Sequence, residues 1–425
     1  MSASGTLELT LRDILCVINP SEEDWSKRFQ IINELRAVVQ SMESFRGATV
    51  EPFGSFVSNL FTRWGDLDIS IELANGSYIS AAGKKHKQTL LEDLHKVLRR
   101  RGGWRRLLFI AHARVPILKF ESSYLDISCD ISINNLNGQM KSKLLFWIDE
   151  IDKRFRDMVL LVKEWAKAHG INDSKAGTLN SYSLSLLVIF HFQTCTPPLL
   201  PPLKDIYPGN LVDDLTGVRA VAEEKIEETC AKNINKFRSN KSRVRNPSTL
   251  SQLFISFLEK FSDLSSRASE EGICPYTGQW EHIDSNMRWM PRTYALFVED
   301  PFEQPINTAR SVNRGQLMRI SEAFRTTHQI LSSGNQNRNS LIQTLVGPRA
   351  SQFLLRMPLN NPSGFNGSNG RIHPQAHRAV HAPSQVQHQF QNTRVGRRPN
   401  NLTARRTVGA SQVQGPQVWR PRSER

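Results

Sequence analysis

Two stretches of the chain alternate strictly between apolar and polar residues. In residues 66–73 and again in residues 125–133, every odd position is apolar and every even position is aspartate, glutamate or serine. A period of two predicts a strand with one buried face. Shorter segments at 49–53, 107–110 and 115–120 predict three further strands.

Other parts of the chain have helical spacing. Apolar residues recur every three or four positions in residues 7–45, with a break and a capping-type signal at Pro20-Ser21-Glu22-Glu23, and again in residues 88–101. From about Leu144 the chain turns helical. Residues 184–192 are almost wholly apolar, which predicts a helix buried on nearly all sides. A helix at 319–331 closes the patterned part of the chain. We therefore expect an α+β fold, with a small sheet and its helices followed by a helical domain.

The composition excludes several classes of protein. The 425 residues are 39% hydrophobic, and no uninterrupted apolar run approaches the ~18–20 residues that a membrane span needs. The N-terminus lacks the basic and apolar regions of a signal peptide, so we expect a soluble intracellular protein. Five cysteines lie far apart with no Cys-x-x-Cys, which argues against a zinc site or a disulfide framework.

The positive charge is concentrated near the C-terminus. The net charge is +15, and the segment from Arg338 onward contains thirteen arginines, one glutamate and no lysine. Residues 333–425 are rich in Asn, Gln, Gly, Pro and Arg and poor in apolar residues, which predicts a disordered basic tail. Such a tail can bind RNA phosphates with low specificity, or it can serve only as a tether.

The alternating stretches carry the candidate chemistry. Asp66 and Asp68 project from the same side of one predicted strand, roughly 6–7 Å apart. Two such carboxylates can converge on Mg²⁺, but they are also ordinary on the solvated face of a strand. Asp130 is the natural third ligand if the two strands are neighbours. Gly54-Ser55, eleven residues before Asp66, could hold phosphate oxygens.

Further motifs follow in order along the chain. Lys163 and Lys167 are spaced i,i+4 on one helix edge, where two ammonium groups would suit a triphosphate or could simply be solvated. Ser181-Tyr182 begins the apolar helix, and Asp300 and Glu303 lie within Val-Glu-Asp-Pro-Phe-Glu, where they could also serve as a turn and a helix cap.

Taken together, these motifs resemble the signature of the DNA polymerase β-like nucleotidyltransferases, specifically the noncanonical poly(A) polymerases and terminal uridylyltransferases. The resemblance spans about residues 8–332 and extends to Asn307-x-x-Arg310. Within this family the chain is most similar to the plant terminal nucleotidyltransferases that uridylate unmethylated small RNAs.

The resemblance implies a role for each motif. Asp66 and Asp68 would hold two Mg²⁺ ions, or Mn²⁺, and Asp130 would hold the ion that faces the RNA 3′-hydroxyl. Tyr182 would stack on the incoming base. The remaining nucleotide contacts would come from Gly54, Ser55, Lys163, Lys167, Ser181, Asp300 and Glu303.

Two positions depart from the family pattern. Ile306 stands where the best-known uridylyltransferases have a histidine that hydrogen-bonds uracil, and Lys141 stands where an asparagine contacts the sugar or base. The choice of base in this chain therefore cannot depend on that histidine.

The resemblance also implies a domain organisation and a set of partners. An N-terminal helix (1–29) would pack on the central domain, followed by a catalytic domain (30–143), a helical central domain (144–332) and the tail (333–425). The partners would be an RNA 3′ end, UTP and a small-RNA effector complex, with no membrane. The protein would be a monomer in the cytoplasm or nucleus.

Two other functions fit the same residues. The first is a poly(A) polymerase that uses ATP, which the missing histidine makes credible. The second is a non-catalytic RNA-binding scaffold on the same fold, although the three aspartates and Gly54-Ser55 argue against it.

Overall fold

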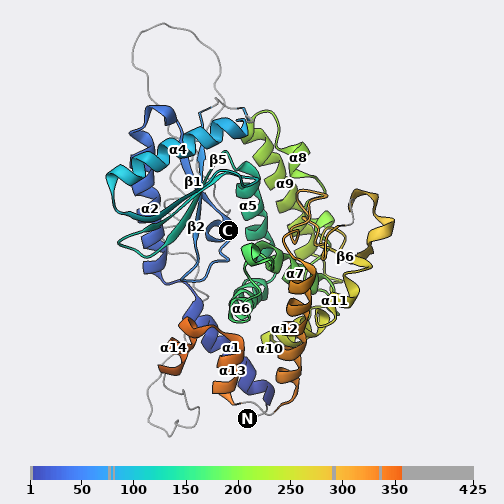
Figure 1. The fold of residues 1–425 in the computed structure, drawn as a ribbon. Coiled ribbons are helices and arrows are strands. Elements are labelled where there is room, and N and C mark those ends of the chain that lie inside the picture. The colour runs from blue at the N-terminus through green and yellow to red at the C-terminus, as the bar shows by residue number, and fades with distance from the viewer. Residues whose placement is uncertain (1–2, 75–77, 80–81, 290–292, 335–336, 357–425) are drawn as a thin grey trace, which may run out of the picture.

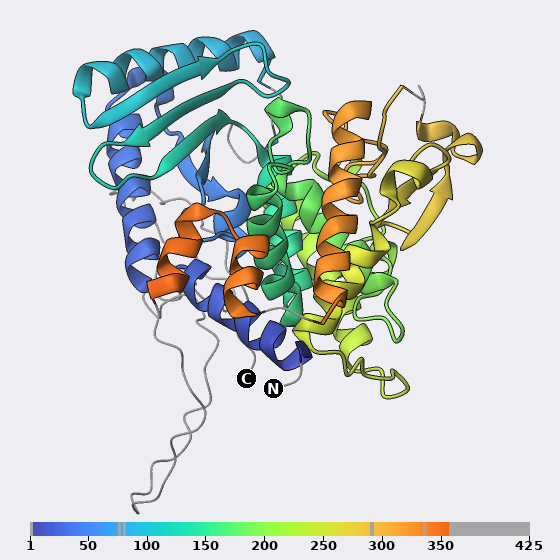
Figure 2. The ribbon, with the colours of Figure 1, turned by 60° about the horizontal axis from the view of Figure 1, so that its bottom comes forward.

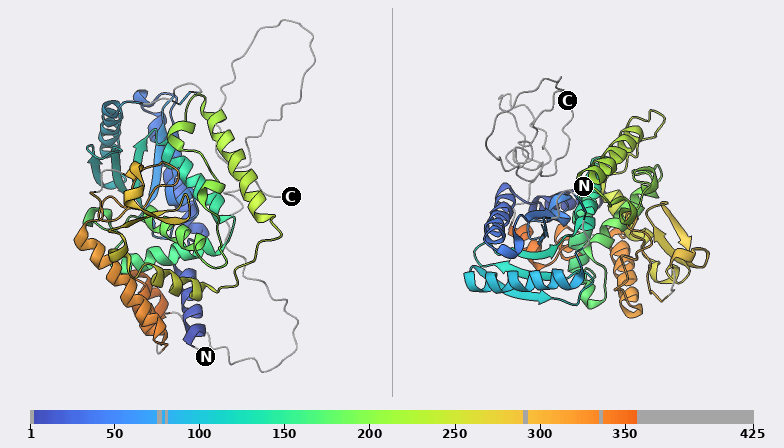
Figure 3. Two further views of the ribbon diagram at one scale, coloured as in Figure 1. Left: turned by 90° about the vertical axis from the view of Figure 1, so that its right-hand side faces the viewer. Right: turned by 90° about the horizontal axis from the view of Figure 1, so that it is seen from above.

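The computed structural model describes residues 3–74, 78–79, 82–289, 293–334 and 337–356 (Figure 1). It has one part built on a β-sheet and a second part built from helices, as the sequence predicted (Figure 3). No helix in these ranges is both long and apolar enough to span a bilayer.

The first part is a five-stranded sheet in the order β1-β2-β5-β4-β3. Its strands are β1 (Thr49–Phe53), β2 (Leu67–Glu72), β3 (Trp104–Ile110), β4 (Ile117–Ser122) and β5 (Ser128–Ile133). Strands β2 and β5 are parallel, and the other pairs are antiparallel. The apolar positions of the alternating stretches are buried, while helices α2 (Glu22–Gln40) and α4 (Lys84–Arg101) pack against the sheet.

The second part is a bundle of helices around the buried helix α7 (Ser181–Gln193). Ten of the thirteen side chains of α7 are buried, which confirms the expectation from its apolar sequence. Its other helices are α5 (Leu136–Asp149), α6 (Arg154–Ala168), α8 (Leu211–Asp214), α9 (Arg219–Arg238), α10 (Leu250–Lys260), α11 (Leu264–Arg267) and α12 (Arg314–Ser332). The sequence analysis did not predict the small hairpin of β6 (Glu271–Cys274) and β7 (Gln279–His282). Single 3₁₀ turns lie at η1 (Glu43–Phe45), η2 (Ser174–Ala176), η3 (Leu203–Asp205), η4 (Ile283–Ser285) and η5 (Met287–Trp289).

The N-terminal boundary differs from the prediction. The chain forms α1 (Ala3–Ile18), which packs on α6 and α10, and then starts α2 at Glu22. Ser21 and Asp24 form a capping box that fixes this new start. Because Trp25 lies in the core of the sheet domain, residues 22–29 belong to that domain and not to a helix on the central domain.

The prediction of a disordered tail from residue 333 was wrong for residues 338–356. These residues form α13 (Arg338–Leu345) and α14 (Pro348–Arg356), which pack on α1 beside α6 (Figure 2). Five of their apolar side chains are buried, namely Leu341, Ile342, Leu345, Ala350 and Leu354. Averaging over the polar segment hid this short amphipathic pattern. Residues 357–425 lie outside the described residues.

Candidate active site

The three aspartates come together because β2 and β5 are parallel neighbours. Asp66 directly precedes β2, and Asp68 is paired in register with Asp130 of β5. This arrangement confirms the prediction that the two alternating strands lie side by side. We refer to Asp66, Asp68 and Asp130 as the aspartate cluster.

The charges of the aspartate cluster oppose one another. Burial, followed by the nearby Asp130 and Asp66 carboxylates, raises the pKa of Asp68 to about 7. Burial and then Asp130 also raise the pKa of Asp66. Three close carboxylates in a partly desolvated site are ionised together only when cations compensate them.

The protein supplies one such cation to Asp130. Lys119 is the cross-strand neighbour of Asp130 on β4, and its Nζ donates to Asp130 Oδ2 at 2.9 Å. The other oxygen, Asp130 Oδ1, is buried and has no hydrogen-bond partner among the described residues. The sequence analysis did not select Lys119, although its place on a strand opposite an aspartate could have been found once the strand order was known.

The aspartate cluster suits a hard divalent cation. It offers only carboxylate oxygens, which Mg²⁺ and Mn²⁺ accept, and the buried Asp130 Oδ1 is free for such a ligand. Within the described part of the chain, no three His, Cys, Asp or Glu side chains form a ready-made metal cluster. The fit therefore rests on the chemistry of the donors and on their position on adjacent strands.

Gly54 lies directly against the aspartate cluster. It follows β1 at the start of α3 (Gly54–Val57) with a φ of +67°, and a Cβ at this position would collide with the Asp68 carboxylate. Its N–H donates to Ser142 Oγ of α5 at 2.7 Å. Glycine is therefore required here both for its backbone conformation and for its close approach to Asp68. Ser55 is the second residue of α3, next to this contact.

The segment that carries Asp66 is held by buried cations. Arg28, which is 1% exposed, donates to the carbonyl oxygens of Gly65 at 2.5 Å and Arg63 at 3.3 Å. Lys163 Nζ donates to Leu60 O at 2.9 Å. The sequence analysis missed Arg28, because a charged residue in an amphipathic helix gives no signal of a tertiary hydrogen bond.

The two lysines of α6 have different surroundings. Lys163 is buried, and its pKa falls to about 7 because of burial and the neighbouring Lys167, with Asp68 opposing this shift. Lys167, one turn later, is exposed. The structure thus brings Lys163 to the aspartate cluster and leaves Lys167 open to solvent; contact of either lysine with a triphosphate stays a prediction.

Tyr182, Asp300 and Glu303 are brought together around Lys141. Tyr182 OH donates to Asp300 Oδ1 at 3.0 Å, and Lys141 Nζ bonds Asp300 Oδ2 at 2.5 Å and Glu303 Oε2 at 2.6 Å. Burial and then Asp300 raise the pKa of Tyr182 well above its ordinary value, so its hydroxyl remains a neutral donor. We refer to these four residues as the Lys141 cluster.

The predicted turn role of Asp300 coexists with these contacts. Asp300 Oδ1 also accepts from the N–H of Phe302 at 3.1 Å, as a turn residue does. Ser181, by contrast, is exposed at the first position of α7, with its hydroxyl near Asn172. The structure does not place Ser181 in contact with either cluster.

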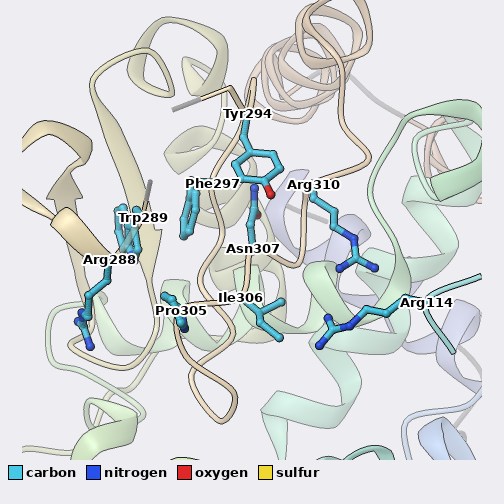
Figure 4. Close-up of a pocket in the computed structure, with 9 residues that line it drawn as sticks. All are labelled: Arg114, Arg288, Trp289, Tyr294, Phe297, Pro305, Ile306, Asn307 and Arg310. Atoms are coloured by element: carbon cyan, nitrogen blue, oxygen red, sulfur yellow. The ribbon is translucent and has the colours of Figure 1, made fainter. Parts of the chain in front are cut away.

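Ile306 lies at the edge of the Lys141 cluster. Its N–H donates to Glu303 O at 3.0 Å, and its carbonyl accepts from the N–H of Asp300 at 2.8 Å. Ile306 also lines a cavity of about 290 Å³, in which the guanidinium groups of Arg114 and Arg310 point toward one another (Figure 4). Arg114, which the sequence analysis did not select, donates to Glu303 Oε1 at 3.0 Å.

Comparison with known proteins supports the fold and identifies the family. Residues 7–149 match the family described as "Poly(A) RNA polymerase, mitochondrial-like, central palm domain". Protein HESO1 of Arabidopsis thaliana is 60% identical over 356 residues, which cover 84% of this chain and 70% of that protein. Poly(A) RNA polymerase cid11 of Schizosaccharomyces pombe is 26% identical, over 75% of this chain and 61% of that protein.

Solved structures agree on the fold. A cytoplasmic RNA terminal U-transferase superposes with a TM-score of 0.63 at 24% identity, covering 80% of this chain and 99% of that one. The complex of mtPAP with UTP superposes with a TM-score of 0.62 at 21% identity, covering 83% of this chain and 72% of that one. The match to HESO1 extends over most of both chains, and the solved structures share the fold. The chain therefore belongs to the noncanonical poly(A) polymerase and terminal uridylyltransferase family of DNA polymerase β-like nucleotidyltransferases.

Proposed function

We propose that this chain is a template-independent RNA 3′-terminal uridylyltransferase. The observation that carries the proposal is the pairing of Asp68 with Asp130 across two parallel strands, with Asp66 next to them and Gly54 packed against Asp68. This arrangement suits the transfer of a nucleotide to a hydroxyl, a reaction catalysed mainly by positioning and charge neutralisation.

In the proposed reaction, the RNA 3′-hydroxyl attacks the α-phosphate of UTP. A new P–O bond forms, the hydroxyl loses its proton, and pyrophosphate leaves as the bond to the β-phosphate breaks. Asp66, Asp68 and Asp130 would hold Mg²⁺ or Mn²⁺, which when bound supplies Lewis-acid activation and neutralises phosphate charge. The site residues that sequence reasoning selected, Lys163 and Lys167, would bind the triphosphate, and Gly54 would let the backbone approach it.

The base would be held by the Lys141 cluster. Tyr182 has an aromatic face and a hydroxyl fixed by Asp300, so it can support a stacked base in one orientation. Asp300 and Glu303 would lie at the edge of that base. Ser55 and Ser181 would contribute to phosphate binding.

The relatives support uridylyl transfer over adenylyl transfer. HESO1 is the relative with extended identity, and one of the superposed proteins is described as an RNA terminal U-transferase. Other relatives are named poly(A) RNA polymerases, and mtPAP has been captured with UTP, GTP and CTP, so the shared fold does not choose the base. The intact aspartate cluster disfavours a non-catalytic scaffold.

The biological setting is proposed from the family resemblance. The substrates would be the 3′ ends of small RNAs or of decay intermediates, reached with a small-RNA effector complex as partner. The protein would act as a monomer in the cytoplasm or nucleus.

The proposal is tested by extending a labelled single-stranded RNA with an unmodified 3′ end. Each of the four nucleoside triphosphates is offered separately and then in competition, with Mg²⁺ or Mn²⁺. We expect incorporation of UTP above the other three nucleotides. Preference for ATP would replace the proposal with a poly(A) polymerase, and no incorporation by folded protein on several RNAs would favour the scaffold.

A further inference from the structure

Lys141 occupies an unusual position for a lysine. Its side chain is only 17% exposed, and it bridges two carboxylates that are themselves 2% and 11% exposed, those of Asp300 and Glu303. Its Nζ lies 5.6 Å from the centroid of the Tyr182 ring. An ammonium group is therefore fixed over the Tyr182 ring in a cation–π contact, next to where a base would stack.

The acceptors around Lys141 are already occupied by donors of the protein. Asp300 accepts from Tyr182, from the N–H of Phe302 and from Lys141, while Glu303 accepts from Lys141 and Arg114. Burial would raise the pKa of Glu303, but Lys141 and then Arg114 lower it, so this carboxylate stays ionised. The two negative charges are balanced by Lys141 and Arg114, so the cluster taken together with Arg114 is close to neutral.

One donor of Lys141 remains available. An ammonium group carries three N–H donors, and among the described residues only Asp300 and Glu303 accept from Lys141, at 2.5 and 2.6 Å. The third N–H is therefore free to meet a ligand beside Tyr182. Ile306, whose backbone bonds those of Asp300 and Glu303, has no polar side-chain atom to offer.

The available N–H of Lys141 would distinguish between the four bases. Uracil carries a carbonyl at position 4, where cytosine has an amino group, while at the corresponding position 6 adenine has an amino group and guanine a carbonyl. An ammonium N–H can pair with a carbonyl, but it is left unpaired when it faces an amino group. An unpaired buried donor costs about 1–3 kcal/mol, which corresponds to roughly 5- to 150-fold in specificity.

We propose that Lys141 is the specificity-determining residue for uracil, donating to a base carbonyl and excluding bases with an amino group at that position. The inference rests on the proposed function, because it requires the base to stack on Tyr182. The proposal gives Lys141 of α5 the role in base selection that Ile306 cannot have, because Ile306 has no polar side-chain atom.

The test compares Lys141→Met with Lys141→Arg. The measured quantity is the ratio of kcat/KM for UTP to that for CTP, ATP and GTP. We expect Lys141→Met to lower the UTP:CTP and UTP:ATP ratios at least about tenfold, because the discriminating donor is lost. The UTP:GTP ratio should change less, since the O6 of guanine is also an acceptor, and Lys141→Arg should keep most of the preference.

Lys143→Met is the matched control. Lys143 is two residues along the same helix, is buried, and pairs with Glu223 at 2.7 Å, away from the Lys141 cluster. A general loss of a buried charge would affect both lysines, but only Lys141→Met should change the nucleotide ratios.

The wild-type result separates the two proposals. Wild-type preference for ATP or CTP would overturn both uridylyl transfer and the role of Lys141. Wild-type preference for UTP that persists within twofold in Lys141→Met would overturn the role of Lys141 alone. If Lys141→Met is folded but does not turn over, the ratio of Kd values for UTP and ATP is measured by competition, and an unchanged ratio overturns the role equally.

Discussion

The aspartate cluster and the Lys141 cluster are built in different ways. The three aspartates sit on or beside two strands that pair in register, so their positions follow directly from the sheet. The Lys141 cluster draws on a helix start, a mid-helix position and a turn, from residues 141 to 303. The sheet fixes the three aspartates relative to one another, which suits a catalytic step that is the same for every nucleotide. The members of the Lys141 cluster come from separate segments, so each side chain can be substituted by itself.

Helix α5 connects the two clusters. Lys141 bonds the carboxylates of one cluster, and the next residue, Ser142, accepts the N–H of Gly54 beside the other. If the two clusters have the proposed roles, catalysis and base choice share a helix but not a side chain. The comparison predicts that variants of the aspartate cluster change the rate for all nucleotides, whereas variants of the Lys141 cluster change the preference among them.

The largest effect is expected from the double variant Asp66→Ala with Asp68→Ala. It should reduce nucleotide incorporation by at least about 10³-fold with every triphosphate, because it removes the groups that would hold the catalytic cations. RNA extension and circular dichroism measure activity and folding. Asp126→Asn is the control, because Asp126 is an exposed aspartate shortly before β5. Near wild-type activity of the double variant would contradict the assignment of Asp66 and Asp68 to the catalytic site.

Gly54→Ala should have the next largest effect. The new Cβ would collide with the Asp68 carboxylate at a backbone conformation that disfavours alanine. We expect a loss of roughly 10²-fold in kcat, as for a misplacement of about 1 Å in a catalytic site. Gly83→Ala is the matched control, because a Cβ on Gly83 would meet no atom within 4 Å. Equal activity of the two variants would contradict the close packing described for Gly54.

Asp68→Asn should change how the stability of the protein depends on pH. The folded-state pKa of Asp68 is raised to about 7 from 3.8, so its contribution to stability is present below pH ~4 and is lost as the pH rises through 7. Without divalent cations, the variant should be more stable than the wild type at pH 8, by on the order of 1–3 kcal/mol. The advantage should disappear near pH 4.

Thermal unfolding in EDTA at pH 4 and pH 8 measures this difference. Adding Mg²⁺ at pH 8 should stabilise the wild type more than Asp68→Asn. An unchanged difference in Tm between the two pH values would show that burial and the neighbouring Asp130 and Asp66 carboxylates do not raise the pKa of Asp68 as described.

The contrast between the clusters also explains what the sequence could predict. Alternation identified the faces of Asp68 and Asp130, and their pairing needed only the order of the strands. Lys141 was noted as a departure from the family, but its bonds to Asp300 and Glu303 depend on contacts across about 160 positions, which no local pattern reveals.

The errors in the fold have similar causes. Helices α13 and α14 were missed because a few apolar residues were averaged with a polar segment, yet Ile342 and Leu354 are fully buried against the rest of the protein. The break after α1 was visible in the sequence, but the domain boundary was placed too late because no local pattern shows that Trp25 packs in the core of the sheet domain. The capping box at Ser21, visible as Ser-Glu-Glu-Asp, gives the physical reason for the break.

The separation of the two clusters is tested most directly by the ratio of kcat/KM for UTP and ATP in Asp130→Asn and Glu303→Gln. Asp130→Asn should lower both values together by at least about 10²-fold and leave the ratio unchanged, because the aspartate cluster does not touch the base. Glu303→Gln should retain more activity and shift the ratio about tenfold or less. A changed ratio in Asp130→Asn together with an unchanged ratio in Glu303→Gln would contradict the account.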